Sequence, residues 1–256
     1  MIDTTNIDAV SRHVATNIRR QIEEAFAKKP DEAGILQGVR YLRGGVTGKR
    51  IVLHPSAKNG GTIPCEGRPE GNYAASLEID PRVKGFRGQP VEIPGPHGGT
   101  LVPDFVIQYT DDTYALADVK AAGKLLEPDV AERMHWIRRV LSQARIPHHI
   151  ITAEALQSEP HRTIRRALRK GARINAHLCI QKAAEAIVRP GPTTVQRLRQ
   201  ELVALGYPSF AVEKLVLMER LSFDASRAWS SSTLIGDIHG PASRVASRDT
   251  IHAVLI

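Results

Sequence analysis

The stretch LVPDFVIQYTDDTYALADVK, from Leu101 to Lys120, sets charged side chains into two apolar runs. Asp104 interrupts the first run, and Asp118 and Lys120 interrupt the second. Both runs are rich in β-branched and aromatic residues, and the polar turn at Asp111-Asp112 joins them into a predicted hairpin. A hairpin that turns there places Asp104 opposite Asp118.

These charges favour a metal site. Alternate residues of a strand share a face, so Asp118 and Lys120 lie beside each other. Two opposed carboxylates repel, and a divalent cation removes that repulsion. The residues Pro103-Asp104 and Asp118-Val119-Lys120 match the signature of PD-(D/E)xK nucleases, in which the lysine stabilises negative charge on the scissile phosphate or orients water. The alternative for this short pattern alone is a solvated strand face.

The overall charge favours a polyanionic partner. The 256 residues carry a net charge of +8 and the sequence pI is about 9.7, which is typical of proteins that bind nucleic acid. Residues 161–200 contain ten lysines and arginines and one carboxylate. Two basic helices are expected at 161–190. The side chains expected to contact DNA are Arg162, Arg165, Arg166, Arg169, Lys170 and Arg173. A solvated basic face is the alternative.

Other protein classes fit poorly. The sequence contains no run of about 18 apolar residues, so we expect no membrane span. The first residues also lack the apolar core of a signal peptide. Cys65 and Cys179 lie far apart, which fits a reduced, bacterial cytoplasm better than a disulfide framework. Neither a CxxC nor an HExxH motif is present, so we expect no structural zinc site or zinc protease.

The chain is expected to form two domains, over residues 1–155 and 156–256. The first is a mixed α/β domain with helices at 8–28, 69–78 and 128–144 and strands at 50–54, 62–65, 83–93, 100–109, 113–120 and 148–152. In the second, helices at 195–205 and 209–218, capped by Thr193-Thr194 and Ser209, precede short strands at 221–224 and 232–235. Helix, turn, helix and two-stranded wing is a winged-helix order.

Several motifs in one order resemble TnsA-type transposon endonucleases over about residues 45–155. They are Glu70, Asp80-Pro81, Gln89-Pro90, Asp104-Phe105, Asp118-Val119-Lys120 and Ile146-Pro147. The resemblance implies a restriction-endonuclease-like (PD-(D/E)xK) mixed-sheet core followed by a helical, winged-helix-like domain. That second domain would bind DNA or dock on partner proteins.

The resemblance also implies the site. The catalytic residues would be Glu70, Asp104, Asp118 and Lys120, and Mg²⁺ (or Mn²⁺) would be held by Glu70, Asp104, Asp118 and the carbonyl of Val119. The family often has glutamine where this chain has Asp118, and an acid there suits metal binding as well or better. Glu66 remains an alternative to Glu70, because it lies four residues earlier and would share the helix face if the helix began sooner.

The implied activity is cleavage of one strand of double-stranded DNA at transposon ends. Such enzymes act beside a DDE-type transposase (TnsB-like) and an AAA+ ATPase regulator (TnsC-like). Two other hypotheses stay open: a stand-alone PD-(D/E)xK restriction or repair nuclease, and a non-catalytic winged-helix DNA-binding assembly protein. The apolar helix at 210–218 has few donors for base edges, so it either reads DNA or packs on protein. His148-His149 is not expected to bind metal, because neighbouring strand residues point in opposite directions.

Overall fold

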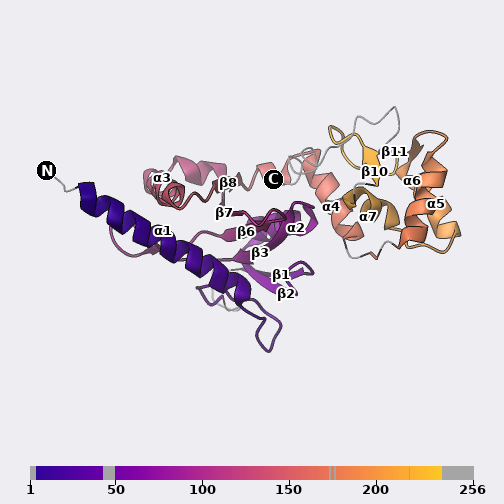
Figure 1. Ribbon diagram of the computed structural model, residues 1–256. Helices are drawn as coiled ribbons and strands as arrows, with labels where there is room; N and C mark the ends of the chain where they lie inside the picture. The colour runs from indigo at the N-terminus through magenta and orange to yellow at the C-terminus, as the bar shows by residue number, and fades with distance from the viewer. Residues whose placement is uncertain (1–3, 43–49, 173, 176, 219, 238–256) are drawn as a thin grey trace. The chain divides into compact units, whose positions relative to one another are not determined.

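The computed structural model describes residues 4–42, 50–172, 174–175, 177–218 and 220–237 (Figure 1). Within these residues the fold is mixed α/β, as the sequence predicts. The chain divides into two compact units, one of residues up to 74 and 83–155, the other of residues 75–82 and 156 onward. Residues 75–82 were expected in the first domain. They join the second because Ile79 is buried in its core.

The first unit holds two helices, most of a third, and the larger sheet. Its elements are α1 (Thr4–Ala27), β1 (Ile51–Ser56), β2 (Gly61–Glu66), the start of α2 (Arg68–Ile79), β3 (Val83–Gly88), β4 (Ile93–Pro94), β5 (Thr100–Leu101), β6 (Phe105–Tyr109), β7 (Tyr114–Lys120), the 3-10 helix η1 (Ala122–Leu126), α3 (Pro128–Gln143) and β8 (His148–Thr152). A short 3-10 helix, η2 (Ala155–Gln157), follows at the division between the units.

The central sheet has the strand order β3-β6-β7-β8. Strands β3, β6 and β7 are antiparallel, whereas β8 returns parallel to β7 through helix α3. Phe105 pairs with Ala117, so the predicted hairpin register is confirmed and Asp104 and Asp118 stand at the next position along. The expected single strand at 100–109 is broken into β5 and β6. Pro103, between them, has no N–H to donate to a ladder.

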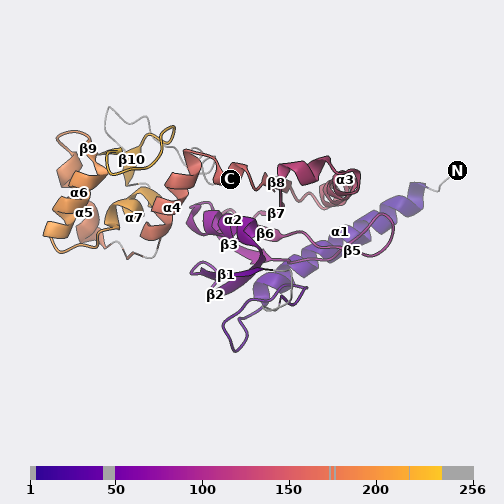
Figure 2. The same ribbon diagram turned by 180° about the vertical axis from the view of Figure 1, so that it is seen from behind.

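Helices cover both faces of this sheet. Val106 of β6 and Leu116 of β7 share one core cluster with residues of α1 and α3, such as Ile18 and Ile137. On the other face, Tyr73 of α2 packs edge-on against Phe105 with ring centroids 5.5 Å apart. Figures 1 and 2 both show α2 beside β6. The start of α2 therefore lies next to the start of β6, which Asp104 directly precedes.

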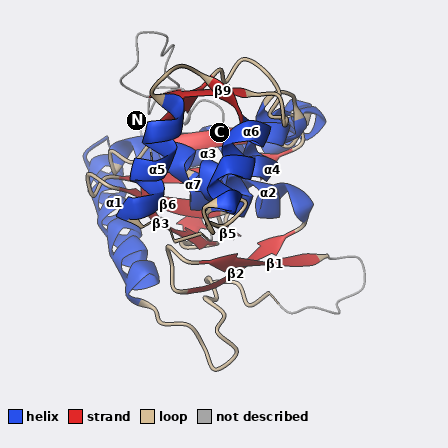
Figure 3. Cartoon of the chain, turned by 90° about the vertical axis from the view of Figure 1, so that its right-hand side faces the viewer, coloured by secondary structure: helices blue, strands red, loops and turns tan. Residues whose placement is uncertain are grey.

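Within its described residues, the second unit contains a small sheet and four complete helices. These are α4 (His161–Gly171), α5 (Leu178–Val188), β9 (Thr193–Thr194), α6 (Val195–Ala204), α7 (Ala211–Leu217), β10 (Leu221–Phe223) and β11 (Leu234–Asp237). The sheet order is β10-β11-β9, and Figure 3 labels β9, the edge strand that directly precedes α6. The predicted Thr194 cap is confirmed, since its side chain accepts from the Arg197 N–H. The predicted Ser209 cap is wrong: Phe210 precedes α7 and no side chain caps that helix.

Helix α7 is packed inside the second unit. Its buried residues are Ala211, Val212, Glu213, Leu215 and Val216. Gly171 at the end of α4 permits the close approach, because a Cβ there would lie 2.4 Å from the backbone nitrogen of Lys214. This burial favours the alternative that the helix packs on protein, because readout of DNA base edges requires exposed side chains. The apolar tail at 249–256 lies outside the described residues.

Candidate metal-dependent active site

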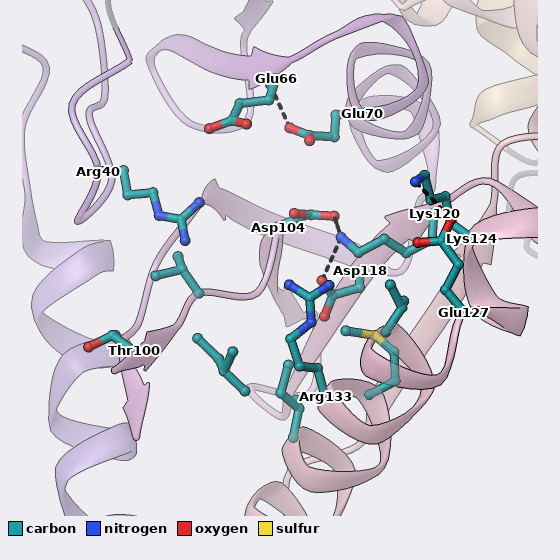
Figure 4. Close-up of a pocket in the computed structure, with 15 residues that line it drawn as sticks. Arg40, Glu66, Glu70, Thr100, Asp104, Asp118, Lys120, Lys124, Glu127 and Arg133 are labelled. Carbon is teal, nitrogen blue, oxygen red and sulfur yellow. Dashed lines mark hydrogen bonds and ion pairs between the residues drawn. The ribbon is translucent and has the colours of Figure 1, made fainter. Parts of the chain in front are cut away.

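Four predicted site residues meet in one cavity of the first unit. Glu70, Asp104, Asp118 and Lys120 line a pocket of about 420 Å³ (Figure 4). The two aspartates and the lysine come from the β6–β7 hairpin and the position just before it, and Glu70 comes from the first turn of α2. The fold therefore brings together residues that lie up to 50 positions apart in the sequence.

Lys120 bridges the two aspartates. Its Nζ lies 2.9 Å from Asp104 Oδ2 and 3.0 Å from Asp118 Oδ1. The backbone N–H of Val119 donates to Asp104 Oδ2 at 2.7 Å. The carboxylates and the ammonium thus converge as the hairpin register predicts, and they lie at the protein interior, with the side chain of Asp118 only 3% exposed.

Both glutamates that compete for the third acidic position line the pocket. The N–H of Glu66, at the end of β2, donates to Glu70 Oε2 at 2.6 Å. Glu70 is buried, whereas Glu66 is partly exposed. A carboxylate in the first turn of a helix is also favoured by the helix dipole. Glu70 is therefore the more deeply buried of the two glutamates, and Glu66 lies beside it at the pocket.

Gln89 supports the acidic cluster. Its side-chain amide donates to Glu66 Oε1 at 3.1 Å, and its backbone N–H donates to the carbonyl of Asp104 at 2.8 Å. Gln89 has φ +46°, a conformation that residues other than glycine adopt at some cost and that occurs often at functional sites. The Gln-Pro motif of the sequence thus frames the pocket, although Gln89 does not line it.

His148 belongs to the site and was not predicted. Its Nε2 lies 2.8 Å from Asp118 Oδ2, and its side chain is 0% exposed. In the parallel ladder Leu116 pairs with His148, which places the histidine on the same face as Asp118. The register between β7 and β8 depends on the path of the connecting helix α3, so the hairpin pattern contains no signal for this contact.

Burial and mutual repulsion shift the ionisation of two carboxyls. Burial, together with the charge of Asp104, raises the pKa of Glu70 to about 8. Burial, followed by the charge of Asp118, raises the pKa of Asp104 to about 6 despite the nearby Lys120. These buried, crowded carboxyls therefore retain protons to higher pH than usual, and a divalent cation that displaced the protons would relieve the repulsion between the carboxylates.

The other two charged groups remain ionised. Burial opposes the charge of Asp118, but hydrogen bonds from His148 and Lys120 outweigh it and lower the pKa of that carboxyl. Burial likewise lowers the pKa of the Lys120 amine, yet the charges of Asp104 and Asp118 prevail and raise it above its ordinary value. Lys120 is thus an ammonium group, which donates protons in hydrogen bonds and cannot accept one.

The donor set fits a hard divalent cation. Carboxylate oxygens are the ligands that Mg²⁺ and Mn²⁺ prefer. The described residues contain no ready-made group of three or more acidic, histidine or cysteine ligands. Lys120 instead neutralises Asp104 and Asp118. A cation would therefore bind between Glu70 and Asp104, where it would displace the proton that the raised pKa of Glu70 retains, or it would compete with the ammonium for the aspartates.

Three cationic side chains at the rim complete the pocket. Arg40, Lys124 and Arg133 line it, and Figure 4 shows the guanidinium groups of Arg40 and Arg133 directed inward. Lys124 pairs with Glu127 at 2.8 Å and Arg133 with Asp129 at 3.1 Å. The sequence carries no signal for these three residues, because exposed arginines and lysines on a helix or loop resemble ordinary surface residues. A buried acidic centre with a cationic rim can hold a phosphodiester.

The predicted DNA contacts on α4 divide into three groups. Arg162, Arg166, Arg169 and Lys170 are exposed. Arg165 is buried and donates to the carbonyl of Leu156, so the prediction that it contacts DNA is corrected to a structural role. Arg173 lies outside the described residues.

The comparisons with known proteins leave the family open. No protein-family profile matches the chain. No curated protein matches its sequence significantly. Over the described residues, no helix combines the length and the apolar character needed to cross a membrane.

Proposed function

We propose that this chain is a metal-dependent DNA endonuclease with a PD-(D/E)xK core that hydrolyses one strand of double-stranded DNA. The observation that carries this proposal is the convergence of Glu70, Asp104, Asp118 and Lys120 in one buried, acidic pocket. The hairpin register that brings Asp104 and Asp118 together was expected from the sequence, and Glu70 reaches the same pocket from a separate helix.

The acidic residues would hold Mg²⁺ or Mn²⁺. Glu70, Asp104 and Asp118 would be the side-chain ligands, with the Val119 carbonyl as a further donor. When bound, the ion supplies a water of lowered pKa as the nucleophile and neutralises charge on the phosphate. Glu66 would act as a neighbour of Glu70, which it orients through its backbone N–H.

The remaining residues would orient the acidic groups and stabilise the charge of the phosphate. Lys120 keeps its proton, so it stabilises negative charge that develops on the phosphate and does not serve as a base. His148 holds the second oxygen of Asp118 and so fixes the orientation of that carboxylate. Arg40 and Arg133 would bind the phosphates that flank the scissile bond, since guanidinium groups pair well with phosphate oxygens.

The place of this reaction in transposition rests on the resemblance to TnsA-type endonucleases. The enzyme would cut one strand at transposon ends, beside a DDE-type transposase and an AAA+ ATPase regulator. The element order of the second unit, with β9 before α6 and the β10–β11 ribbon after α7, also agrees with the winged-helix-like domain that the resemblance implies.

A nicking assay tests the proposed activity. Purified full-length protein is incubated with supercoiled plasmid and Mn²⁺, and conversion to the open circle is measured for the wild type, Asp104→Asn and Asp112→Asn. Asp112 is a matched control, because it lies on the same hairpin at its exposed turn. We expect Asp104→Asn to abolish nicking while Asp112→Asn retains it. Equal nicking by all three proteins would refute the assignment.

A further inference from the structure

Helix α4 carries a cluster of exposed cations. Arg166, Arg169 and Lys170, here called the α4 cationic face, are exposed. Among the ion pairs of the described residues none involves these three side chains, although the charge of Lys170 acts on the buried carboxyl of Glu213. Arg162, one turn earlier, pairs with Glu159 at 2.8 Å. Three exposed cations within about 6 Å of helix axis form a local concentration of charge that favours a polyanion.

The α4 cationic face borders a hollow in the second unit. The face, Thr163, Phe210 and Trp229 line a cavity of about 650 Å³. Lys170 Nζ lies 5.2 Å from the centre of the Phe210 ring, a cation–π contact that holds the ammonium at the cavity. The N–H of Trp229 donates to Thr163 Oγ1 at 3.1 Å and so attaches the loop after β10 to α4. The Lys170 ammonium is thus held at the cavity, which the exposed Arg166 and Arg169 also line.

The element order points first to a different helix for DNA contact. The helix that precedes the two-stranded ribbon, α7, is the one expected to enter a DNA groove, but five of its 7 residues are buried and α4 lies against it at Gly171. Helix α4 presents exposed charge, whereas the cation of α7, Lys214, is only partly exposed. Its face offers arginine, lysine and one threonine, without the asparagine or glutamine side chains that pair with adenine. Such a face contacts phosphates more readily than base edges.

We propose that the α4 cationic face binds the phosphate backbone of double-stranded DNA without reading its sequence. The choice of DNA over an acidic peptide rests on the nuclease function proposed above. Binding at α4 requires no cation and no cleavage, so it can be measured separately from the activity of the acidic pocket.

The experiment measures binding of the full-length protein to two fluorescent duplexes of unrelated sequence, in EDTA, over a range of salt concentrations. It compares the wild type, Arg166→Ala/Arg169→Ala, and the matched control Lys182→Ala/Arg189→Ala, which removes the same charge from exposed residues of α5 and its end. Thermal unfolding of each protein checks that the fold is retained.

We expect the α4 variant to lower the slope of log affinity against log salt by about 2, one for each lost phosphate contact, equally for both duplexes. Between 50 and 200 mM salt the wild type would then lose about tenfold more affinity than this variant. The α5 control would retain the wild-type slope.

Three results would overturn this inference. The first is absence of DNA binding by the wild type, the second an equal loss of DNA affinity in both variants, and the third a loss of affinity for one duplex alone. If the wild type binds no DNA but binds an acidic peptide through α4, the partner of this face is a protein. DNA binding through α4 without any nicking in Mn²⁺ would instead refute the nuclease proposal and leave this one standing.

Discussion

The acidic pocket of the first unit and the α4 cationic face of the second hold charge in opposite ways. In the pocket the charged groups are buried and bonded to one another, as Lys120 is to Asp104 and Asp118. In the α4 cationic face the side chains are exposed, and none of the three forms an ion pair within the described residues. Buried, coupled charges suit chemistry at one point, whereas exposed charges suit attraction of an extended polyanion. Substitutions in the two regions should therefore have effects that differ in magnitude and in the property they change.

The largest effect is expected for the third acid of the pocket. Glu70→Gln should reduce the nicking rate in Mn²⁺ at least about 1,000-fold, because it removes a charged ligand of the metal that would activate the attacking water. Glu66→Gln should reduce the rate about tenfold or less, since Glu66 orients Glu70 through its backbone N–H. Plasmid nicking rates measure both. The opposite ranking would assign the ligand role to Glu66.

Removal of the bridging lysine should destabilise the metal-free fold. Lys120→Met leaves Asp104 and Asp118 buried without their cation, at a cost of about 3 kcal/mol in the free energy of unfolding. Urea unfolding in EDTA at pH 7.5 measures this, and added Mg²⁺ should recover part of the loss. An unchanged midpoint in EDTA would show that the lysine is not needed to hold the aspartates.

The raised pKa of Glu70 predicts how stability depends on pH. In the unfolded chain this carboxyl has its ordinary pKa of 4.5, and in the fold the pKa is about 8. The native state therefore binds the proton more tightly, and the free energy of unfolding falls as the pH rises from 4.5 to 8. In Glu70→Gln the free energy of unfolding should no longer decrease over this pH range. At pH 8 this variant should be more stable than the wild type by about 1 kcal/mol or more.

Urea unfolding in EDTA at pH 5 and pH 8 provides the measurement. Titration of Asp104 lowers the free energy of unfolding by a smaller amount, between its ordinary pKa and about 6, in both proteins. The effect of Glu70 is therefore taken from the difference between the wild type and Glu70→Gln. Equal pH dependence of the wild type and Glu70→Gln would show that Glu70 titrates normally.

The smallest effect separates two neighbouring arginines of α4. Arg165→Ala leaves the carbonyl of Leu156 without its donor and should cost about 1 to 2 kcal/mol of stability. Arg166→Ala should leave the unfolding midpoint unchanged and weaken DNA binding instead, because Arg166 is exposed. Urea unfolding and duplex binding of the two variants measure this exchange of roles. A stable Arg165→Ala variant would contradict the buried contact.

Local patterns predicted the hairpin and not what packs on it. Alternation and a polar turn determine the pairing of Phe105 with Ala117, because both signals lie within 20 residues. His148 reaches Asp118 through a parallel strand whose register depends on the helix between them. The broken strand at Pro103 follows from its missing N–H, which an apolar pattern does not record.

The second unit shows the same limit. The cap at Thr194 is local and was predicted, but the burial of α7 depends on the approach of α4 at Gly171. Arg165 and Arg166 are adjacent basic residues, and only the packing of α4 distinguishes the buried one from the exposed one. Charge counts therefore located the basic helix without showing which of its arginines face solvent.

The most direct test of the acidic pocket as a metal site is anomalous scattering from a crystal of the full-length protein soaked in Mn²⁺. We expect a manganese peak with Glu70 and Asp104 oxygens at roughly 2.1 to 2.3 Å, a typical distance for small divalent cations on oxygen ligands. The peak should be absent in Asp104→Asn crystals soaked in the same way. A pocket that remains empty of manganese in the wild type, with Lys120 still bridging Asp104 and Asp118, would contradict the central claim.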